Sequence, residues 1–324
     1  MAQKNVRGQS KILDNFYTKP HVAKYFINTT ERILHKSMAD WSLIVEPSAG
    51  NGAFFYDLPG HNRIGIDIAS KSADIQRTDF LKWNASQRSV DPNNILVIGN
   101  PPFGQNGSLA RSFIEHAFTF AKTVAFILPA SFKKSSMQNK IKPRNAWLIY
   151  QEDVPDSSFT YEGVSKNIPA VFQIWKLQES PRKQIDVRLT HPDFDFIRPD
   201  YDFLTSHANR VVMIQRVGVE AGTVSTDLNY QLGKITSRNF FFILAKSQDV
   251  YDLLLTLGPI LKNSEEKYQT AGMPSVSMGE IVMTYITEKE KNELGGNRIA
   301  SSHMNSTTET KSFTHSRTSS MFYF

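Results

Sequence analysis

The residues best suited to chemistry form a short segment, Asn100-Pro101-Pro102-Phe103, directly after an apolar run at 95–99. Two successive prolines fix φ and remove two backbone donors, so they make the segment rigid. The side-chain carbonyl of Asn100 and the backbone carbonyl of Pro101 can both accept hydrogen bonds from one amine. Phe103 offers a face on which a planar base can stack. The segment therefore predicts a site for a planar amine or amide.

Such a site can make a weak nucleophile react. The lone pair of an aniline-like amine is delocalised into its ring, so the nitrogen attacks poorly unless two acceptors draw it towards tetrahedral geometry. The same acceptors stabilise the positive charge that develops as the amine attacks a methyl sulfonium. The resulting cation loses its proton easily, so no strong general base is needed. We expect catalysis by positioning and electrostatics.

Two segments upstream have features of a nucleotide-like ligand site. Residues 46–52, Glu-Pro-Ser-Ala-Gly-Asn-Gly, follow an apolar run at 43–45, and their glycines permit a tight turn and close approach of a ligand. An ordinary turn between strand and helix explains them equally. Asp67 lies in the next apolar run, at 63–68, near the spacing at which a carboxylate can hold both hydroxyls of a ribose. A helix N-cap or a surface acid is the alternative.

A third segment, Thr78-Asp79-Phe80-Leu81, places an acid beside an aromatic ring. Asp79 can accept a hydrogen bond from an adenine amine while Phe80 packs on the adenine ring. A turn-forming Asp next to a core Phe explains the same pair. Taken alone, this segment favours the turn.

Short apolar runs alternate with helical patterns over the first half of the chain. The runs lie at 43–45, 63–68, 95–99, 123–128, 147–150 and 170–175, and the helical patterns at 20–35 and 109–120. Runs this short and apolar on both faces are typical of a parallel sheet covered on both sides by helices. We expect an α/β, doubly wound sheet that binds its ligand at the carboxyl ends of the strands.

The order and spacing of these segments resemble the class I amino-methyltransferases of nucleic acids, above all the gamma-type adenine-specific DNA methyltransferases. The resemblance covers roughly residues 10–180. It includes residues 15–23, Asn-Phe-Tyr-Thr-Lys-Pro-His-Val-Ala, which resemble the family's Tyr-Thr-Pro segment. Lys19, between Thr18 and Pro20, departs from that pattern. The resemblance implies a Rossmann-like methyltransferase domain.

S-adenosylmethionine is the cofactor that the resemblance implies. It assigns the methionine and its carboxylate to Tyr17, Thr18, Glu46, Ala49 and Gly50, the ribose to Asp67, the adenine to Asp79 and Phe80, and the target base to Asn100, Pro101, Pro102 and Phe103. The implied reaction is methylation of N6 of a flipped-out adenine in DNA. An RNA adenosine methyltransferase is one alternative, and a catalytically silent nucleic-acid-binding subunit with the same fold is another. The Asn-Pro-Pro-Phe sequence alone does not decide the substrate, because it also occurs in enzymes that methylate protein glutamine, ribosomal RNA guanine or the adenosine beside an mRNA cap.

The composition is consistent with a nucleic-acid partner. The formal net charge is +6 and the sequence pI is about 9.3, and a basic balance favours a polyanion through counterion release. The candidate nucleic-acid contacts are Lys133, Lys134, Lys140, Lys142, Arg144, Arg210, Arg216 and Arg238. A solvated loop explains the basic run at 133–144 equally well.

Other classes of site and location are disfavoured. The chain has no cysteine, which excludes disulfides, thiolate zinc sites and cysteine nucleophiles. The histidines are scattered, so we expect no metal. No apolar run is long enough to cross a bilayer, and we expect a cytoplasmic protein of a bacterial or viral host cell.

The sequence divides into three parts. Residues 1–184 form the predicted methyltransferase domain. Residues 185–287, with strand-like runs at 211–214, 240–244 and 281–285 and a helical pattern at 249–257, form the predicted target-recognition unit. Residues 288–324 are rich in Ser, Thr and Asn, a composition that predicts a disordered tail.

Overall fold

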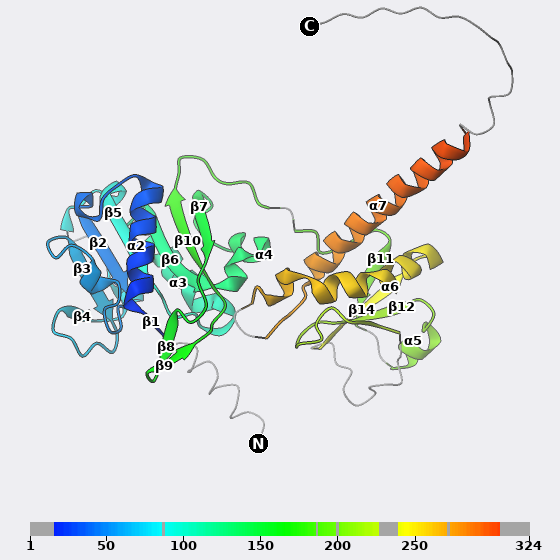
Figure 1. Ribbon diagram of the computed structural model, residues 1–324, viewed down its shortest axis with the longest axis horizontal. Helices are drawn as coiled ribbons and strands as arrows, with labels where there is room; N and C mark the ends of the chain where they lie inside the picture. The colour runs from blue at the N-terminus through cyan, green and yellow to red at the C-terminus, as the bar shows by residue number, and fades with distance from the viewer. Residues whose placement is uncertain are drawn as a thin grey trace, which may run out of the picture.

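Figure 1 shows a computed structural model of the chain, which describes residues 16–85, 88–185, 187–198, 201–226, 239–270 and 273–304. Two units are visible in it. The larger contains the sheet around strands β2 to β7 and β10, and the smaller contains strands β11 to β14 with the long helix α7.

One seven-stranded sheet forms the centre of the larger unit. Across the sheet, the strands are β4 (Ile75–Arg77), β3 (Arg63–Asp67), β2 (Leu43–Pro47), β5 (Ile95–Gly99), β6 (Thr123–Pro129), β10 (Ala170–Leu177) and β7 (Ala146–Asp153). All are parallel except β10, which runs antiparallel to β6 and β7. The predicted α/β sheet is thus confirmed as a mixed one. β10 is reversed because a hairpin, instead of a crossover helix, connects it to β7.

Helices cover both faces of this sheet. α2 (Pro20–Leu34) packs on one face, where Phe26 contacts the side of β6 that carries Ala125 and Ile127. α3 (Ser108–Ala117) packs on the other face, in the cluster that contains Val124 and Phe126. The alternation along β6 explains why both sets of residues are apolar, since each face of a central strand is buried.

Short helical segments connect the main helices and strands in both units. They are η1 (Met38–Asp40), η2 (Phe55–Asp57), η3 (Phe80–Lys82), η5 (Pro92–Asn94), η6 (Gln105–Gly107), η7 (Ala130–Lys133), α4 (Ser135–Gln138) and η8 (Glu265–Tyr268).

A second, small sheet lies beside the carboxyl ends of the central strands. It contains β1 (Tyr17–Thr18), β8 (Phe159–Tyr161) and β9 (Val164–Lys166), all antiparallel. The register places Thr18 opposite Phe159. The side chain of Lys19, directly after β1, contacts β9, because its Nζ donates a hydrogen bond to Oγ of Ser165 at 2.7 Å. The residue that departs from the family pattern therefore ties β1 to the β8–β9 hairpin.

The smaller unit is an antiparallel sheet covered by helices. The strand order is β11 (Phe194–Ile197), β14 (Phe240–Ala245), β12 (Val211–Gln215) and β13 (Val224–Ser225), and the helices are α5 (Tyr201–Ser206), α6 (Gln248–Asn263) and α7 (Met278–Met304). Its core joins residues of β12 and β14 to the buried faces of α6 and α7. The predicted strands at 211–214 and 240–244 and the predicted helix at 249–257 are confirmed.

The start of α7 corrects one prediction. Residues 281–285 are helical and not a strand, because Ile281, Val282 and Tyr285 occupy one buried helical face. Ser277 and Glu280 cap the helix, since each backbone N–H donates to the side chain of the other.

The end of α7 corrects another. The helix continues to Met304, so residues 288–304 do not belong to a disordered tail. Lys291 pairs with Glu288 at 2.6 Å along the helix, and Lys289 pairs with Asp193 at 2.8 Å. Such ion pairs stabilise the helix, although the Ser, Thr and Asn content of residues 288–324 predicted a disordered tail. Residues 305–324 lie outside the described part.

None of the helices in the described ranges combines the length and apolar character needed to cross a bilayer.

Candidate active site

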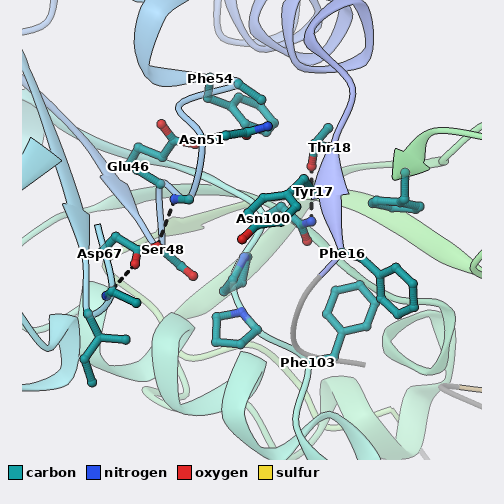
Figure 2. A pocket seen from close by; sticks show the side chains of 18 of the residues that line it. Phe16, Tyr17, Thr18, Glu46, Ser48, Asn51, Phe54, Asp67, Asn100 and Phe103 are labelled. Carbon is teal, nitrogen blue, oxygen red and sulfur yellow. Dashed lines mark hydrogen bonds between the residues drawn. The ribbon is translucent and has the colours of Figure 1, made fainter. Parts of the chain in front are cut away.

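A cavity of about 580 Å³ opens at the carboxyl ends of β2, β3 and β5, beside β1 (Figure 2). The parallel strands bring segments that are distant in the sequence to this edge of the sheet. Of the predicted catalytic and cofactor residues, the cavity is lined by Tyr17, Thr18, Glu46, Ala49, Gly50, Asp67, Asn100, Pro101, Pro102 and Phe103.

The glycine-containing turn after β2 forms the floor next to Tyr17. Gly50 has a φ of +55°, in the left-handed region that favours glycine. A Cβ at Gly50 would lie 2.9 Å from Cε1 of Tyr17, so the ring of Tyr17 covers this backbone closely. Glycine is therefore required at position 50 for two reasons: its positive φ and the lack of space for a side chain.

Asp67 connects the turn after β2 with the loop after β3. Its Oδ2 accepts a hydrogen bond from the backbone N–H of Gly50 at 2.9 Å, and its Oδ1 accepts one from Ala69 at 2.7 Å (Figure 2). Each carboxylate oxygen keeps a further lone pair for a ligand hydroxyl. The carboxylate is thus fixed in orientation and able to accept more hydrogen bonds.

Glu46, at the end of β2, is a buried carboxyl that lines the cavity. Its side chain is 2% exposed, and its Oε2 has no hydrogen-bond partner among the residues that the structure describes. Burial raises the pKa of this carboxyl well above its ordinary value, although hydrogen bonds from the backbone of Phe55 and Phe54 act in the opposite direction. A buried oxygen without a partner calls for a donor or a cation from a ligand.

Asn100 follows β5 and lies opposite β1. Its Nδ2 donates to Oγ1 of Thr18 at 3.1 Å (Figure 2), while its Oδ1 is buried and has no partner within the described ranges. The side chain is thus held by one end and presents an acceptor at the other. This carbonyl oxygen is available to an amine in the cavity.

Apolar side chains surround this acceptor. Phe103 is buried and belongs to the core on the α2 face, yet it also lines the cavity. Further apolar lining residues are Phe16, Leu109, Phe159 and Ile168. Of these, the sequence offers Phe159 as an aromatic wall of the target pocket, with a core position as the equal alternative. Phe159 reaches the cavity because β8 pairs with β1, a contact that only the folded register reveals.

Asp79 and Phe80 do not contribute to the cavity, although both are described. Asp79 caps η3 by accepting from the backbone N–H of Leu81 at 3.1 Å. Phe80 is 3% exposed and packs against Phe113, with ring centroids 5.0 Å apart. These contacts fit the turn and core interpretation of the segment, and the adenine contacts of Asp79 and Phe80 stay a prediction.

The loop after β3 supplies contacts that the motifs did not indicate. Ile68, Ala69, Lys71 and Ser72 line the cavity, and Ile68 is 70% exposed. The sequence signal for this loop is Ile68, an apolar residue directly after Asp67. An exposed Ile beside a polar site has no core to stabilise it, which indicates a contact with a ligand.

Three of the predicted nucleic-acid contacts, Lys133, Lys134 and Arg216, interact with other residues of the chain. Nζ of Lys133 lies 2.8 Å from Oδ1 of Asp153. Lys134 forms an ion pair of 2.9 Å with Glu280, and both side chains are largely buried. Arg216 is exposed, with its guanidinium 5.3 Å from the ring centroid of Phe241. Arg238 lies outside the described residues.

The described residues contain no group of three or more His, Asp or Glu side chains that could hold a metal ion.

Similar folds occur among solved structures. A magnesium protoporphyrin IX methyltransferase from Synechocystis PCC 6803, solved with bound S-adenosylmethionine, shares 10% identity over 49% of this chain and 80% of its own, with a TM-score of 0.35. A type I restriction-modification system methyltransferase subunit from Streptococcus thermophilus shares 14% identity over 51% and 45%, with a TM-score of 0.36. The 23S rRNA methyltransferase ErmE shares 14% identity over 48% and 69%, with a TM-score of 0.30.

No known protein-family model and no curated protein sequence matches the chain. Because the structural similarities have TM-scores below 0.5, they establish neither a family nor a substrate.

Proposed function

We propose that this chain is an S-adenosylmethionine-dependent methyltransferase that methylates N6 of adenine in DNA. The observation that carries the proposal is the partnerless carbonyl oxygen of Asn100, which faces an aromatic-lined part of the cavity. It is supported by the rigid Pro101-Pro102 segment and by the order of the sequence motifs. RNA adenosine is the second candidate substrate, since the cavity chemistry is the same for both.

The residues present fit the proposed cofactor. The buried carboxyl of Glu46 matches an ammonium group, such as that of a methionine moiety, because a cation satisfies both its charge and its free oxygen. Gly50 and Tyr17 would enclose the methionine chain, and Asp67 would accept from ribose hydroxyls. Ile68 offers an apolar surface to the adenine, in the place predicted for Phe80. When bound, S-adenosylmethionine supplies a methyl group activated by a sulfonium centre.

The protein's own contribution is to hold the amine. Asn100 Oδ1 and the Pro101 carbonyl oxygen accept the two hydrogens of the target amine, which aligns its lone pair for attack. As the N–C bond forms, the methyl–sulfur bond of the donor would break with its electron pair going to sulfur, which leaves S-adenosylhomocysteine, and these two oxygens would stabilise the positive charge that develops on nitrogen. The proton then leaves to solvent. No described side chain has to act as a strong base in this scheme.

A base in a duplex has to leave the stack to reach this cavity, at a cost of a few kcal/mol. The apolar lining formed by Phe103, Phe159 and Ile168 can offset that cost through stacking and burial. A single-stranded base reaches the site without the cost of unpairing. Duplex and single-stranded substrates therefore belong in the same assay.

The decisive experiment compares matched duplex DNA, single-stranded DNA and RNA with a tritiated methyl donor, followed by nucleoside analysis of the product. We expect N6-methyladenine in DNA. Label found only in RNA would replace DNA by RNA as the substrate. A folded protein that fails to bind S-adenosylmethionine in a titration would instead indicate a silent nucleic-acid-binding subunit.

A further inference from the structure

We propose that Lys134 and Glu280 form a latch that fixes the C-terminal unit, residues 194–304, in the position needed to deliver nucleic acid to the cavity. Both are positioning residues in this scheme, since neither lines the cavity. The inference rests on the proposed function, with the C-terminal unit as the part that binds the nucleic acid beside the target base.

The ion pair joins the two units of the molecule. Nζ of Lys134 lies 2.9 Å from Oε1 of Glu280, and the side chains are only 17% and 15% exposed. Charges this well shielded from water interact strongly, and either one left alone would carry a desolvation penalty. Each side chain therefore restricts where the other can lie, unlike a surface pair that opens and closes freely.

Glu280 connects the latch to the whole C-terminal unit. Its Oε2 accepts a hydrogen bond from the backbone N–H of Ser277 at 2.6 Å, while its own N–H donates to Oγ of Ser277 at 3.2 Å. This capping box fixes the carboxylate at the start of α7. One residue further, α7 enters the core of the unit through Ile281 and Val282, both fully buried. The position of the carboxylate thus defines the position of the unit.

Lys134 connects the latch to the target side of the cavity. It directly follows η7, whose Phe132 is fully buried. The ring of Phe132 lies 2.9 Å from the place of a Cβ on Gly107, just beyond the segment that starts at Asn100. At the beginning of η7, the backbone N–H of Ala130 donates to the carbonyl of Pro169, next to the lining residue Ile168. Lys134 therefore follows a segment that contacts Gly107 and Pro169, which lie close in the sequence to the lining residues Leu109 and Ile168.

This arrangement explains how a small unit could direct chemistry in a cavity that it does not line. Positioning dominates the proposed reaction, and displacing a reactant by about 1 Å can cost about 100-fold in rate. Because Lys134 directly follows η7, and Phe132 of η7 packs against Gly107, the ion pair relates the position of the bound strand to that of Asn100. A broken latch leaves the cofactor site intact but misplaces the substrate.

The test is charge reversal in the full chain. Lys134→Glu and Glu280→Lys should each lower kcat/KM for DNA by about tenfold or more, with the Kd for S-adenosylmethionine changed less than about twofold. The double variant, which restores opposite charges, should recover most of the lost activity. Glu280→Gln is the milder variant, since an amide oxygen can still accept from Ser277. Glu288→Gln is the control matched to Glu280→Gln, because Glu288 pairs with Lys291 within α7, and it should leave activity unchanged.

Small-angle scattering of the same variants gives a readout that needs no catalysis. We expect a larger radius of gyration for each single reversal and a return to the wild-type value in the double variant. Unchanged scattering and unchanged kcat/KM in the single variants overturn the latch. So does a loss that the double variant does not recover, because it indicates local destabilisation. A wild-type protein without activity on any nucleic acid refutes the proposed function, and scattering still decides whether the latch exists.

Discussion

Asn100 and Glu46 present free oxygen atoms to one cavity, but the two oxygens differ in what they can bind. The Asn100 amide is neutral and is held at its other end by Thr18, so its oxygen suits a neutral amine that becomes positive during reaction. The Glu46 carboxyl is buried and can carry a full negative charge, which suits a ligand that is a cation from the start. The substrate and cofactor ends of the cavity are therefore distinguishable by single substitutions.

Asn100→Ala and Asp67→Ala should have opposite effects. Removing the Asn100 carbonyl abolishes one acceptor for the developing charge, so we expect kcat to fall by about 100-fold or more with little change in cofactor affinity. Removing the Asp67 carboxylate should weaken cofactor binding by about tenfold or more. Isothermal titration with S-adenosylhomocysteine and single-turnover kinetics separate the two effects. Equal loss of cofactor binding in both variants would mean that the segment 100–103 is misassigned.

Glu46 should make cofactor binding depend on pH. Burial raises the pKa of the folded carboxyl well above 4.5, its ordinary value. Between these two values the folded chain retains a proton that the unfolded chain has lost, so stability falls as pH rises through the window. A bound ammonium favours the ionised carboxylate, so cofactor affinity should rise over the same window. Titrations across a pH series should show this rise in wild type and a flat profile in Glu46→Gln; a slope that persists in the variant assigns the effect to another group.

At the scale of single residues, sequence spacing located part of the cavity lining. The segments at 46–52, 67 and 100–103 each follow a strand, and parallel strands bring such segments to one edge. For Phe159, a wall of the target pocket and a core position were equal alternatives in the sequence, because its position depends on the pairing of β8 with β1. Phe80 is buried in the core, and its predicted adenine contact stays a prediction, because an aromatic ring beside an acid looks the same in a core as in a site.

At the scale of elements, the turn after β2 and strand β1 act together. Strand β1 places Tyr17 over Gly50, and Asp67 holds the turn from the other side through the Gly50 backbone. The hairpin β8–β9 in turn holds β1, through the register with β8 and through the hydrogen bond from Lys19 to Ser165. The cofactor end of the cavity is therefore built from three elements that support one another.

Gly50→Ala tests this assembly. An added Cβ at a φ of +55° is strained by about 1–2 kcal/mol, and it also displaces the ring of Tyr17. Because Tyr17 is half-exposed and free to move outward, we expect only modest loss of stability but about tenfold weaker cofactor binding. Thermal unfolding and cofactor titration measure the two. Gly60→Ala is the control, since its Cβ would meet nothing within 4 Å in the described part of the chain; matching effects in both variants would contradict the role given to Tyr17.

For most of the segments named in the sequence analysis, the apolar periodicity predicted correctly whether they form a helix or a strand. It failed at 281–285, where consecutive apolar residues fit a strand as well as a buried helical face. The capping pair Ser277 and Glu280 precedes this run and was the sequence signal that favours a helix. Strand β10 was located correctly, but its reversed direction depends on the hairpin that precedes it.

At the scale of the whole molecule, the ion pair between Lys134 and Glu280 is what the sequence could not supply. A lysine in a basic loop predicts a solvated cation or a phosphate contact, and nothing local identifies a carboxylate from the distant start of α7. The change of pattern near residue 185 predicts a second unit. How the two units are joined required the folded chain.

The pairing of β1 with β8 has a consequence for the order in which the protein assembles. Tyr17 and Thr160 lie 143 positions apart in the sequence, yet their strands are adjacent. Contacts this distant close slowly, because the intervening chain has to be ordered first. The cavity wall that contains Thr18 is therefore expected to be completed after the central sheet.

Two neighbouring amides can time this step. The N–H of Lys19 donates to the carbonyl of Ser158, whereas the N–H of Ala23 donates within its own helix, to the carbonyl of Lys19. In pulse-labelling hydrogen exchange during refolding, the amide of Ala23 should become protected before that of Lys19. Simultaneous protection would mean that β1 docks together with α2. In the expected order, strand β1 of a chain emerging from the ribosome has no partner strand until the hairpin near residue 160 has been synthesised. The cavity is then completed last, so the protein becomes able to catalyse only at the end of folding.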